Sequence, residues 1–290
     1  MKILIGHTGF VGSNLQKQHK FDLLFNSKNI QNAYGTAPDL CVYSGVFSEK
    51  FKADSFPEDD LAHIQNALEN IRLIKPKNLV LISTVDTIPN RQSVDIFEDT
   101  PFNTDDLTPY GRHRLLLENE VRTIYPSTLI VRLPGLFGEG LKKNFIYDMI
   151  NLVPAMLRKI EPVLVPYYYE DETGFFRLKP DADRETLKGI FNELGFSALN
   201  FTDSRSKFAF YNLDYLWGHI QTLREKGVTL AHMAVEPVGA GELYKAIFGR
   251  DFINELDRPP FDYSFFKTRH WDEYIFNKGQ IIEEIRRIVC

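Results

Sequence analysis

The sequence predicts an α/β fold in which a parallel sheet is wound on both sides by helices. Short apolar runs alternate with segments of helical spacing through the first half of the chain, which is the pattern of repeated strand–helix units. A glycine-rich turn separates the first apolar run from the first expected helix. With 290 residues, of which 43% are hydrophobic, the chain can form one large domain or two joined ones around a substantial core.

The first half supplies the expected sheet. Apolar runs predict strands at residues 2–5, 22–25, 39–43, 79–82 and 128–131. Between them, Leu61, Ile64, Leu68, Ile71 and Ile74 recur at helical spacing and predict a helix over 57–75. A second helix is expected over 109–125, where proline occupies a permitted opening position. Crossovers between parallel strands of this kind are almost always right-handed.

The second half differs in character. Helices are expected at 144–152, 180–195, 213–225, 240–248 and 281–288, with a short strand at 229–233 and an extended aromatic segment at 162–169. No flexible linker separates the halves. We therefore expect residues 1–140 to form the sheet domain and 141–290 a smaller α/β lid packed on it, with some later strands and helices returning to the first domain.

Composition excludes several classes of partner. The net charge of -5 and the pI near 5.8 argue against nucleic acid held by general electrostatics. The two cysteines, Cys41 and Cys290, form no metal-binding spacing or disulfide framework and suit a reducing cytoplasm. No signal peptide is expected at the N-terminus, and no apolar run approaches the ~18 residues of a membrane span. We expect a cytoplasmic protein without nucleic-acid, membrane or metal partners.

The glycine turn suggests the first function. Gly6, Gly9 and Gly12 follow the first strand at three-residue spacing and open a helix. Glycine tolerates positive φ and allows close backbone approach, and a phosphate can bind the N–H groups at a helix start. This context is the one that a dinucleotide-binding, Rossmann-type domain requires. The alternative is a strand–turn–helix that binds nothing.

The end of the second strand bears on the choice of cofactor. In dinucleotide folds an acidic residue there binds the ribose 2′-hydroxyl, whereas a basic residue accepts a 2′-phosphate. Here the sequence reads Asn26-Ser27-Lys28, with no acid. NADP is therefore favoured over NAD, and an ordinary polar turn is the alternative reading.

A tyrosine near a helix start is the candidate acid or base. Tyr110 is followed four residues later by Arg114, on the same helical face. A nearby positive charge lowers a tyrosine pKa, and such a tyrosine can exchange a proton with a sugar hydroxyl or ketone. Thr84, at the end of an expected strand, could orient the same oxygen while a hydride moves to or from a nicotinamide. By itself, the pattern also fits a surface tyrosine on a charged helix.

Taken together, these motifs resemble the extended short-chain dehydrogenase/reductase family, in its nucleotide-sugar-modifying branch of NAD-dependent epimerases and dehydratases. Gly-His-Thr-Gly-Phe-Val-Gly at 6–12 is similar to the family's glycine turn, Ile-Ser-Thr at 82–84 to its catalytic strand end, and Tyr-Gly-Arg-His-Arg at 110–114 to its Tyr-x-x-x-Lys motif. Val-Arg-Leu-Pro-Gly-Leu-Phe-Gly at 131–138 is similar to the strand whose proline lies against the nicotinamide. The resemblance covers residues 1–150 well and 205–248 loosely, and 155–204 has no counterpart.

The resemblance implies a set of site residues. The implied catalytic residues are Thr84, Tyr110 and Arg114. The expected cofactor contacts, together with Asn26, Ser27 and Lys28, are Gly6, Thr8, Gly9, Phe10, Val11, Gly12, Ser44, Gly45, Ile82, Ser83 and Pro134. The expected substrate contacts are Val85, Asp86, Asn144 and Arg205.

Three features depart from the family pattern. Arg114 stands where the family has a lysine that hydrogen-bonds the nicotinamide ribose and lowers the tyrosine pKa; arginine keeps the charge but has a larger fork. Val85 stands where the dehydratases carry an acid, which disfavours a dehydratase. The turn at 44–46 replaces an Ala-rich one.

These observations predict a function. We expect an NAD(P)-dependent oxidoreductase acting on a nucleotide-linked sugar, as a keto-sugar reductase that uses tyrosine as acid or base. The alternatives are a nucleotide-sugar epimerase, and a non-catalytic dinucleotide-binding sensor or scaffold protein. Homodimers are common in the resembling family, and the helices at 57–75 and 109–125 could supply such an interface.

Overall fold

The computed structural model describes residues 1–90 and 92–290 and divides the chain into two compact units. The first unit contains Met1–Gly140, Ala209–Pro237 and Asp262–Ile281. The second contains Leu141–Phe208, Val238–Phe261 and Ile282–Cys290. Two segments of the second half, 209–237 and 262–281, therefore belong to the same unit as the glycine turn.

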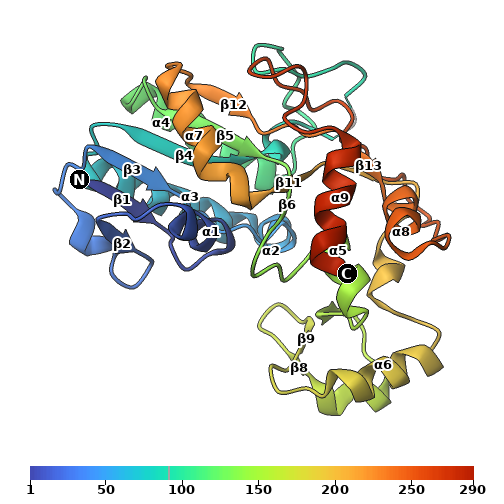
Figure 1. Cartoon of the computed structure of the whole chain (residues 1–290). Coiled ribbons are helices and arrows are strands. Elements are labelled where there is room, and N and C mark those ends of the chain that lie inside the picture. The colour runs from blue at the N-terminus through green and yellow to red at the C-terminus, as the bar shows by residue number, and fades with distance from the viewer. Residues whose placement is uncertain (91) are drawn as a thin grey trace. The chain divides into compact units, whose positions relative to one another are not determined.

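A six-stranded parallel sheet forms the centre of the first unit (Figure 1). Its order is β12-β5-β4-β3-β1-β2, and every neighbouring pair is parallel. The strands are β1 Lys2–Ile5, β2 Leu23–Phe25, β3 Leu40–Tyr43, β4 Leu79–Thr84, β5 Leu129–Leu133 and β12 Leu230–His232. The predicted α/β fold with a parallel sheet is confirmed.

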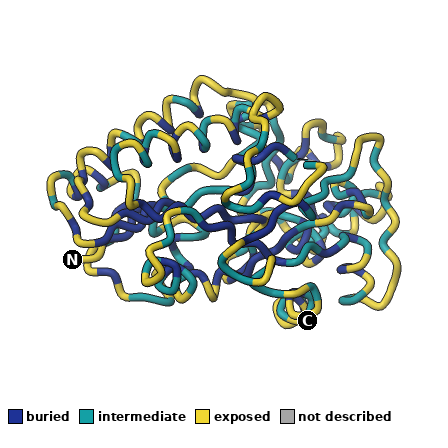
Figure 2. The backbone as a smooth tube through the Cα atoms, turned by 90° about the horizontal axis from the view of Figure 1, so that it is seen from above, coloured by how far each residue is buried: buried dark blue, intermediate teal, exposed yellow. Residues whose placement is uncertain are grey.

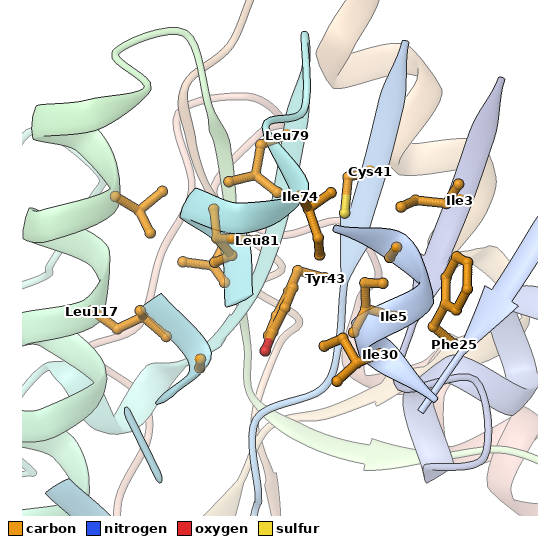
Figure 3. Packing of buried hydrophobic residues seen from close by; sticks show 14 of the residues in the cluster. Ile3, Ile5, Phe25, Ile30, Cys41, Tyr43, Ile74, Leu79, Leu81 and Leu117 are labelled. Atoms are coloured by element: carbon orange, nitrogen blue, oxygen red, sulfur yellow. The ribbon is translucent and has the colours of Figure 1, made fainter. Parts of the chain in front are cut away.

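Helices cover both faces of this sheet. They are α1 Phe10–Gln18, α3 Pro57–Ile74, α4 Pro109–Ile124 and α7 Leu216–Glu225. One core cluster joins Ile3, Ile5 and Tyr43 of the sheet to Ile64 of α3 and Leu117 of α4, as Figure 3 shows for the sheet residues and Leu117. Figure 1 shows α1 and α7 on the opposite face, where α1 packs on α7. Alternate strand residues thus point to opposite helical layers, as in a doubly wound sheet.

The strand order locates the expected ligand crevice. β1 lies between β2 and β3. From β1 the chain crosses to β2 on one side, and it then reverses direction to β3 on the other side, from which the rest of the sheet is built. In open α/β sheets, ligands bind beyond the carboxyl ends of the strands at such a reversal. Here the glycine turn follows β1, and the Ser44-Gly45 turn follows β3.

Smaller elements complete the first unit. They are the 3₁₀ helices η1 Ile30–Ala33, η2 Val85–Thr87 and η5 Leu213–Tyr215, the helix α2 Lys50–Ser55, and the parallel pair β6 Gly135–Phe137 and β11 Phe210–Asn212. Buried residues follow the strands, whereas the helices alternate between buried and exposed positions (Figure 2). Among the residues described, no helix is long and apolar enough to cross a membrane.

The second unit contains helices and short antiparallel sheets. Its helices are α5 Phe145–Asn151, α6 Arg184–Glu193 and α8 Ala240–Phe248, and α9 Lys278–Val289 begins in the first unit and ends in the second. Its sheets are β7-β9-β8, from Met156–Leu157, Phe176–Leu178 and Tyr168–Glu170, and β10-β13, from Lys207–Phe208 and Val238–Gly239. A 3₁₀ helix, η4, spans Ala198–Phe201.

The extended segment expected at 162–169 was wrong over most of its length. Residues Pro162–Tyr167 form a 3₁₀ helix, η3, and a strand begins only at Tyr168. Pro162 and Pro166 fix φ near −65°, which suits a 3₁₀ turn as well as an extended chain. Burial of Leu164 in a local cluster with Leu187 and Phe191 accompanies the helical turn.

Candidate active site

The glycine turn forms a tight cradle between β1 and α1. Gly6 has a φ of 84°, in the left-handed region that favours glycine. A Cβ at Gly12 would lie 2.2 Å from the Gly6 carbonyl oxygen, so α1 can approach the turn only because residue 12 has no side chain. Gly9 caps α1, and a Cβ there would lie 3.4 Å from the Gly6 carbonyl oxygen, an ordinary contact. Space therefore remains beside the helix start, where Phe10 and Val11 begin the first turn after Thr8.

The turn after β2 lies beside this cradle. The Gly6 N–H donates to the Phe25 carbonyl oxygen at 2.7 Å, and the Asn26 amide nitrogen is 3.4 Å from His7 Nε2. The Asn26 side chain also accepts from the Lys28 N–H at 2.9 Å. Ser27 and Lys28 are exposed. The structure therefore brings the 26–28 turn to the glycine turn, with a hydroxyl and an ammonium on the surface.

The serines predicted to meet the cofactor are engaged within the protein. Ser44 donates from its N–H and its hydroxyl to the Ile5 carbonyl oxygen, at 3.0 and 2.8 Å. The Ser83 hydroxyl donates to Glu118 at 2.5 Å. Their backbones, with Gly45 and Ile82, remain at the carboxyl ends of β3 and β4. Pro134 lies between β5 and β6.

Thr84 and Tyr110 come together at the end of β4. The Tyr110 and Thr84 side chains lie close enough for the Thr84 hydroxyl to lower the pKa of Tyr110. Tyr110 lies in the first turn of α4, where its N–H donates to Asp54 at 2.9 Å. A Cβ at Gly111 would lie 2.0 Å from the Asp86 carbonyl oxygen, so the helix start can press against the turn after β4. Two residues 26 positions apart in the sequence thus form one hydroxyl pair.

Burial dominates the electrostatics of Tyr110. Desolvation raises the pKa of Tyr110 to about 12, although the Arg114 charge and the Thr84 hydrogen bond both lower it. The carboxylates of Asp86 and Asp60 add to the upward shift of this pKa. The expectation that arginine eases ionisation is correct in sign, but its effect is smaller than that of burial. The Tyr110 hydroxyl therefore stays protonated at neutral pH.

Arg114 is buried and held on three sides. It is 4% exposed, and its guanidinium carbon lies 4.0 Å from the centroid of the Tyr110 ring. Nη1 donates to the Asp60 carboxylate, and Nη2 donates to the Phe47 carbonyl oxygen at 2.6 Å. Asp60 also contacts His113 Nδ1 at 2.8 Å. The buried Nε of Arg114 has no hydrogen-bond partner among the residues described.

Asp86 joins a cation to the hydroxyl pair. Lys50 Nζ lies 2.5 Å from Asp86 Oδ1, and the Thr84 hydroxyl lies 3.4 Å from Oδ2. Tyr263 lies in the returning segment 262–281. Burial raises its pKa most, and the nearby charges of Asp86 and Tyr110 raise it further. Val85, a predicted substrate contact, is instead 3% exposed and packs in an apolar cluster with partners that include Phe265. Its side chain is therefore committed to the core.

The remaining predicted substrate residues lie in the second unit. Asn144 caps α5, where its side chain accepts from the Tyr147 N–H at 3.2 Å. Arg205 forms a fork with Asp203, at 2.9 and 2.7 Å, and also donates to Glu255 at 3.0 Å. Both side chains thus have structural partners within their own unit.

Sequence reasoning missed several residues of this site. Among them, Asp60, Lys50, Glu118 and Tyr263 were not singled out, although each contacts or influences a predicted residue. A signal existed for Asp60, which lies four residues before Ile64 and shares its buried face of α3. Within 1–90 and 92–290, no group of His, Cys, Asp and Glu side chains is arranged to hold a metal ion.

Solved structures with the same fold cover nearly the whole chain. A dTDP-4-dehydrorhamnose reductase from Clostridium acetobutylicum aligns with a TM-score of 0.65 at 15% identity, covering 99% of each chain. The corresponding reductase from Bacillus anthracis, in complex with NADP, aligns with a TM-score of 0.67 at 16% identity, covering 99% of this chain and 96% of that one.

An epimerase shares the fold as well. A UDP-N-acetylglucosamine 4-epimerase from Methanobrevibacter ruminantium, in complex with UDP-N-acetylmuramic acid, aligns with a TM-score of 0.63 at 12% identity, covering 99% of this chain and 96% of that one. At such identities these likenesses establish the fold alone. No curated protein matches the sequence.

The family model described as "NAD dependent epimerase/dehydratase family" matches residues 19–173, which is more than half of the chain. The match includes the turn after β2, the Thr84 and Tyr110 pair and Arg114. It confirms the resemblance drawn from the motifs: the chain belongs to the NAD dependent epimerase/dehydratase family.

Proposed function

We propose that this chain is an NAD(P)-dependent oxidoreductase that reduces a keto sugar linked to a nucleotide. The observation that carries the proposal is the Thr84–Tyr110 hydroxyl pair at the carboxyl end of β4, with the Arg114 guanidinium on the tyrosine ring. Membership of the family supports an enzyme with a nicotinamide cofactor. The sheet topology places this pair and the glycine turn at the same edge, since the strands are parallel.

The residues present fit a dinucleotide. The cradle at 6–12 would lose its shape if Gly6 or Gly12 carried a Cβ, whereas Gly9 leaves room for a ligand at the helix start. We propose that a pyrophosphate would bind there and that Ser27 and Lys28 would accept a 2′-phosphate, so NADP is favoured. The Bacillus anthracis reductase, which has the same fold, binds NADP.

Side chains of this protein would carry out the proton transfer. The cofactor supplies or accepts a hydride when bound. Tyr110 would donate its hydroxyl proton to the oxygen of the sugar carbonyl as that oxygen gains charge. Thr84 would orient the same oxygen, and Arg114 would stabilise the tyrosinate that remains until solvent returns the proton.

The substrate contacts belong to the same proposal. Asp86 lies beside Thr84 and is paired with Lys50, so these two side chains would border the sugar. Because Val85 is buried where a dehydratase has an acid, elimination of water is disfavoured. Asn144 and Arg205 are further proposed substrate contacts, and each has a partner within its own unit, the Tyr147 N–H and Asp203.

Two alternatives make different predictions. An epimerase would use the same tyrosine but would consume no net NADPH. A non-catalytic dinucleotide sensor is favoured by one observation, that Tyr110 is buried with a pKa of about 12 while two Arg114 nitrogens are already bonded. Such a protein would bind nucleotide without turnover.

One experiment separates these functions. The whole chain would be titrated with NADPH and NADH by fluorescence and then supplied with a panel of nucleotide-linked 4-keto sugars. We expect micromolar NADPH binding and stoichiometric NADPH oxidation with at least one sugar. Interconversion of sugar epimers without net oxidation would support the epimerase, and binding without turnover of any nucleotide sugar would support the sensor.

Location and assembly are further parts of the proposal. The free cysteines, Cys41 buried and Cys290 exposed, suit a reducing cytoplasm. Helices α3 and α4 pack on each other and could present an outer face to a second copy. Light scattering of the purified chain would show whether it is a homodimer.

A further inference from the structure

Asp60 occupies a position that the fold would otherwise give to an apolar side chain. It lies on α3 in the buried stripe that continues with Ile64, Ala67 and Ile71. Asp60 is only 5% exposed. An ionised carboxylate in such a place is costly unless a cation or strong donors compensate it. Its presence therefore requires a specific partner.

That partner is the residue at which the chain departs from its family pattern. Arg114 Nη1 donates to Asp60, and the two groups form a buried ion pair. The second nitrogen, Nη2, is held by the Phe47 carbonyl oxygen at 2.6 Å. Because a guanidinium is planar, two fixed nitrogens determine the plane and direction of the whole group. The guanidinium carbon lies over the ring of Tyr110, 4.0 Å from the ring centroid.

The third nitrogen of Arg114, Nε, is not hydrogen-bonded within the described part of the chain. Nε is also buried. A buried donor without an acceptor is unfavourable, and such groups in native proteins usually meet a ligand or water. An acceptor from a bound molecule beside Tyr110 would satisfy it.

We propose that Asp60 is a positioning residue that holds the Arg114 guanidinium over the Tyr110 ring, with its Nε–H directed to bind an oxygen of the nicotinamide nucleotide. The identity of the ligand rests on the proposed function. The clamp, by which we mean the bonds from Arg114 to Asp60 and to the Phe47 carbonyl, does not. The family lysine has one charged nitrogen at its tip, whereas arginine has three nitrogens in a rigid fork, so bonds to two of them leave the third in a fixed direction. Asp60 and the Phe47 carbonyl supply those bonds.

The clamp has an electrostatic consequence. Asp60 offsets part of the Arg114 charge, and its carboxylate raises the pKa of Tyr110. His113 contributes a second contact to Asp60, at 2.8 Å, from the same helix as Tyr110 and Arg114. The groups that contact the guanidinium from α3, α4 and the 44–49 loop are thus Asp60, Tyr110 and the Phe47 carbonyl, and His113 contacts Asp60.

The test compares variants of the whole chain by two readouts that do not need turnover. The first is the ¹H–¹⁵N NMR signal of Arg114 Nε–H, assigned by its loss in Arg114→Lys, and its protection from exchange with water. The second is the dissociation constant for NADP⁺. Asp60→Ala removes the acceptor for Nη1, Asp60→Asn retains an acceptor without the charge, and Asp59→Ala removes the same charge from the exposed neighbouring position.

We expect a protected Nε–H signal in the wild type, which shifts when NADP⁺ is added. Asp60→Ala should lose the protection and weaken NADP⁺ binding at least about tenfold, the ratio for losing one hydrogen bond to a charged group. Asp60→Asn should keep most of both, and Asp59→Ala should equal the wild type.

The inference is overturned if Asp60→Ala is folded and retains both the protected signal and the wild-type affinity. If Asp60→Ala does not fold, Asp60→Asn decides: an unprotected Nε–H together with wild-type NADP⁺ affinity in folded Asp60→Asn also overturns the inference. A wild type with a protected Nε–H that binds no nicotinamide nucleotide would instead refute the proposed function and the ligand role of Nε, while the clamp would stand.

Discussion

Alanine substitutions at Gly9 and Gly12 should distinguish the contribution of the glycine turn to stability from its contribution to cofactor binding. In Gly12→Ala, the new Cβ would lie 2.2 Å from the Gly6 carbonyl oxygen and 2.9 Å from the His7 Cα. Both are backbone atoms, so the turn itself must move. Overpacking of this kind costs about 1–3 kcal/mol of unfolding free energy, and it also distorts the cradle.

In Gly9→Ala, the backbone needs no change. Gly9 has φ −77° and ψ 168°, which alanine adopts readily, and its Cβ would lie 3.4 Å from the Gly6 carbonyl oxygen. Loss of a glycine helix cap in favour of alanine costs about 0.5–1 kcal/mol. The methyl group would nevertheless project beside the helix start where we place the pyrophosphate, so NADPH binding should weaken strongly, by roughly 10-fold or more.

Urea unfolding and NADPH titration of the two variants test this reasoning. We expect Gly12→Ala to lose both stability and binding, and Gly9→Ala to lose binding with little change in stability. Wild-type NADPH affinity in Gly9→Ala would refute the placement of the phosphate at this helix start. Wild-type stability in Gly12→Ala would refute the close approach of α1 to the turn.

Three further outcomes follow from other residues. Lys28→Ala should weaken NADPH binding roughly tenfold but leave NADH binding unchanged, and equal losses for both nucleotides would contradict a 2′-phosphate contact. Burial raises the pKa of Asp148 from 3.8 to about 7. The folded chain therefore holds this proton more tightly than the unfolded chain, and it loses stability as the pH rises through this interval. In urea titrations, Asp148→Asn should increase the free energy of unfolding by up to about 4 kcal/mol at about pH 8 and leave it unchanged near pH 3. Glu118→Gln leaves the buried guanidinium of Arg132 without its carboxylate partner and should cost about 3–5 kcal/mol of unfolding free energy. The Glu120→Gln control, at a half-exposed position paired with Arg72, should cost little.

Local pattern explains how much of the fold could be predicted. The strand at Lys2–Ile5 and the helix that begins at Phe10 were predicted because an apolar run, a glycine turn and a helical segment lie together within 18 residues. The helix α3 was predicted over 57–75 and ends at Ile74, since its apolar spacing is regular. Such elements depend on neighbours in the sequence.

Long-range contacts explain what could not be predicted. The pairing of β12 with β5 joins Leu230 to Ile130, and no local pattern identifies that partner. The returning segment 262–281 brings Tyr263 toward Asp86 for the same reason. The order of the sheet and the membership of the first unit therefore required the structure.

The candidate site shows the same division. Thr84, Tyr110 and Arg114 could be predicted because a motif fixes their spacing. The influence of Asp60 could not, since it depends on two helices packing together. Nor could burial of Tyr110 be inferred from its arginine neighbour, and burial reverses the direction of the pKa shift that the neighbour alone would produce.

The role of Tyr110 as proton donor is tested most directly by the rate of NADPH oxidation by Tyr110→Phe with the best nucleotide keto sugar of the panel, measured beside its NADPH affinity. We expect the rate to fall by roughly 10²–10⁴, the contribution of a positioned general acid, with NADPH binding unchanged because only the hydroxyl is removed. A wild-type rate in this variant, with the cofactor bound as before, would contradict the assignment of Tyr110 as the proton donor.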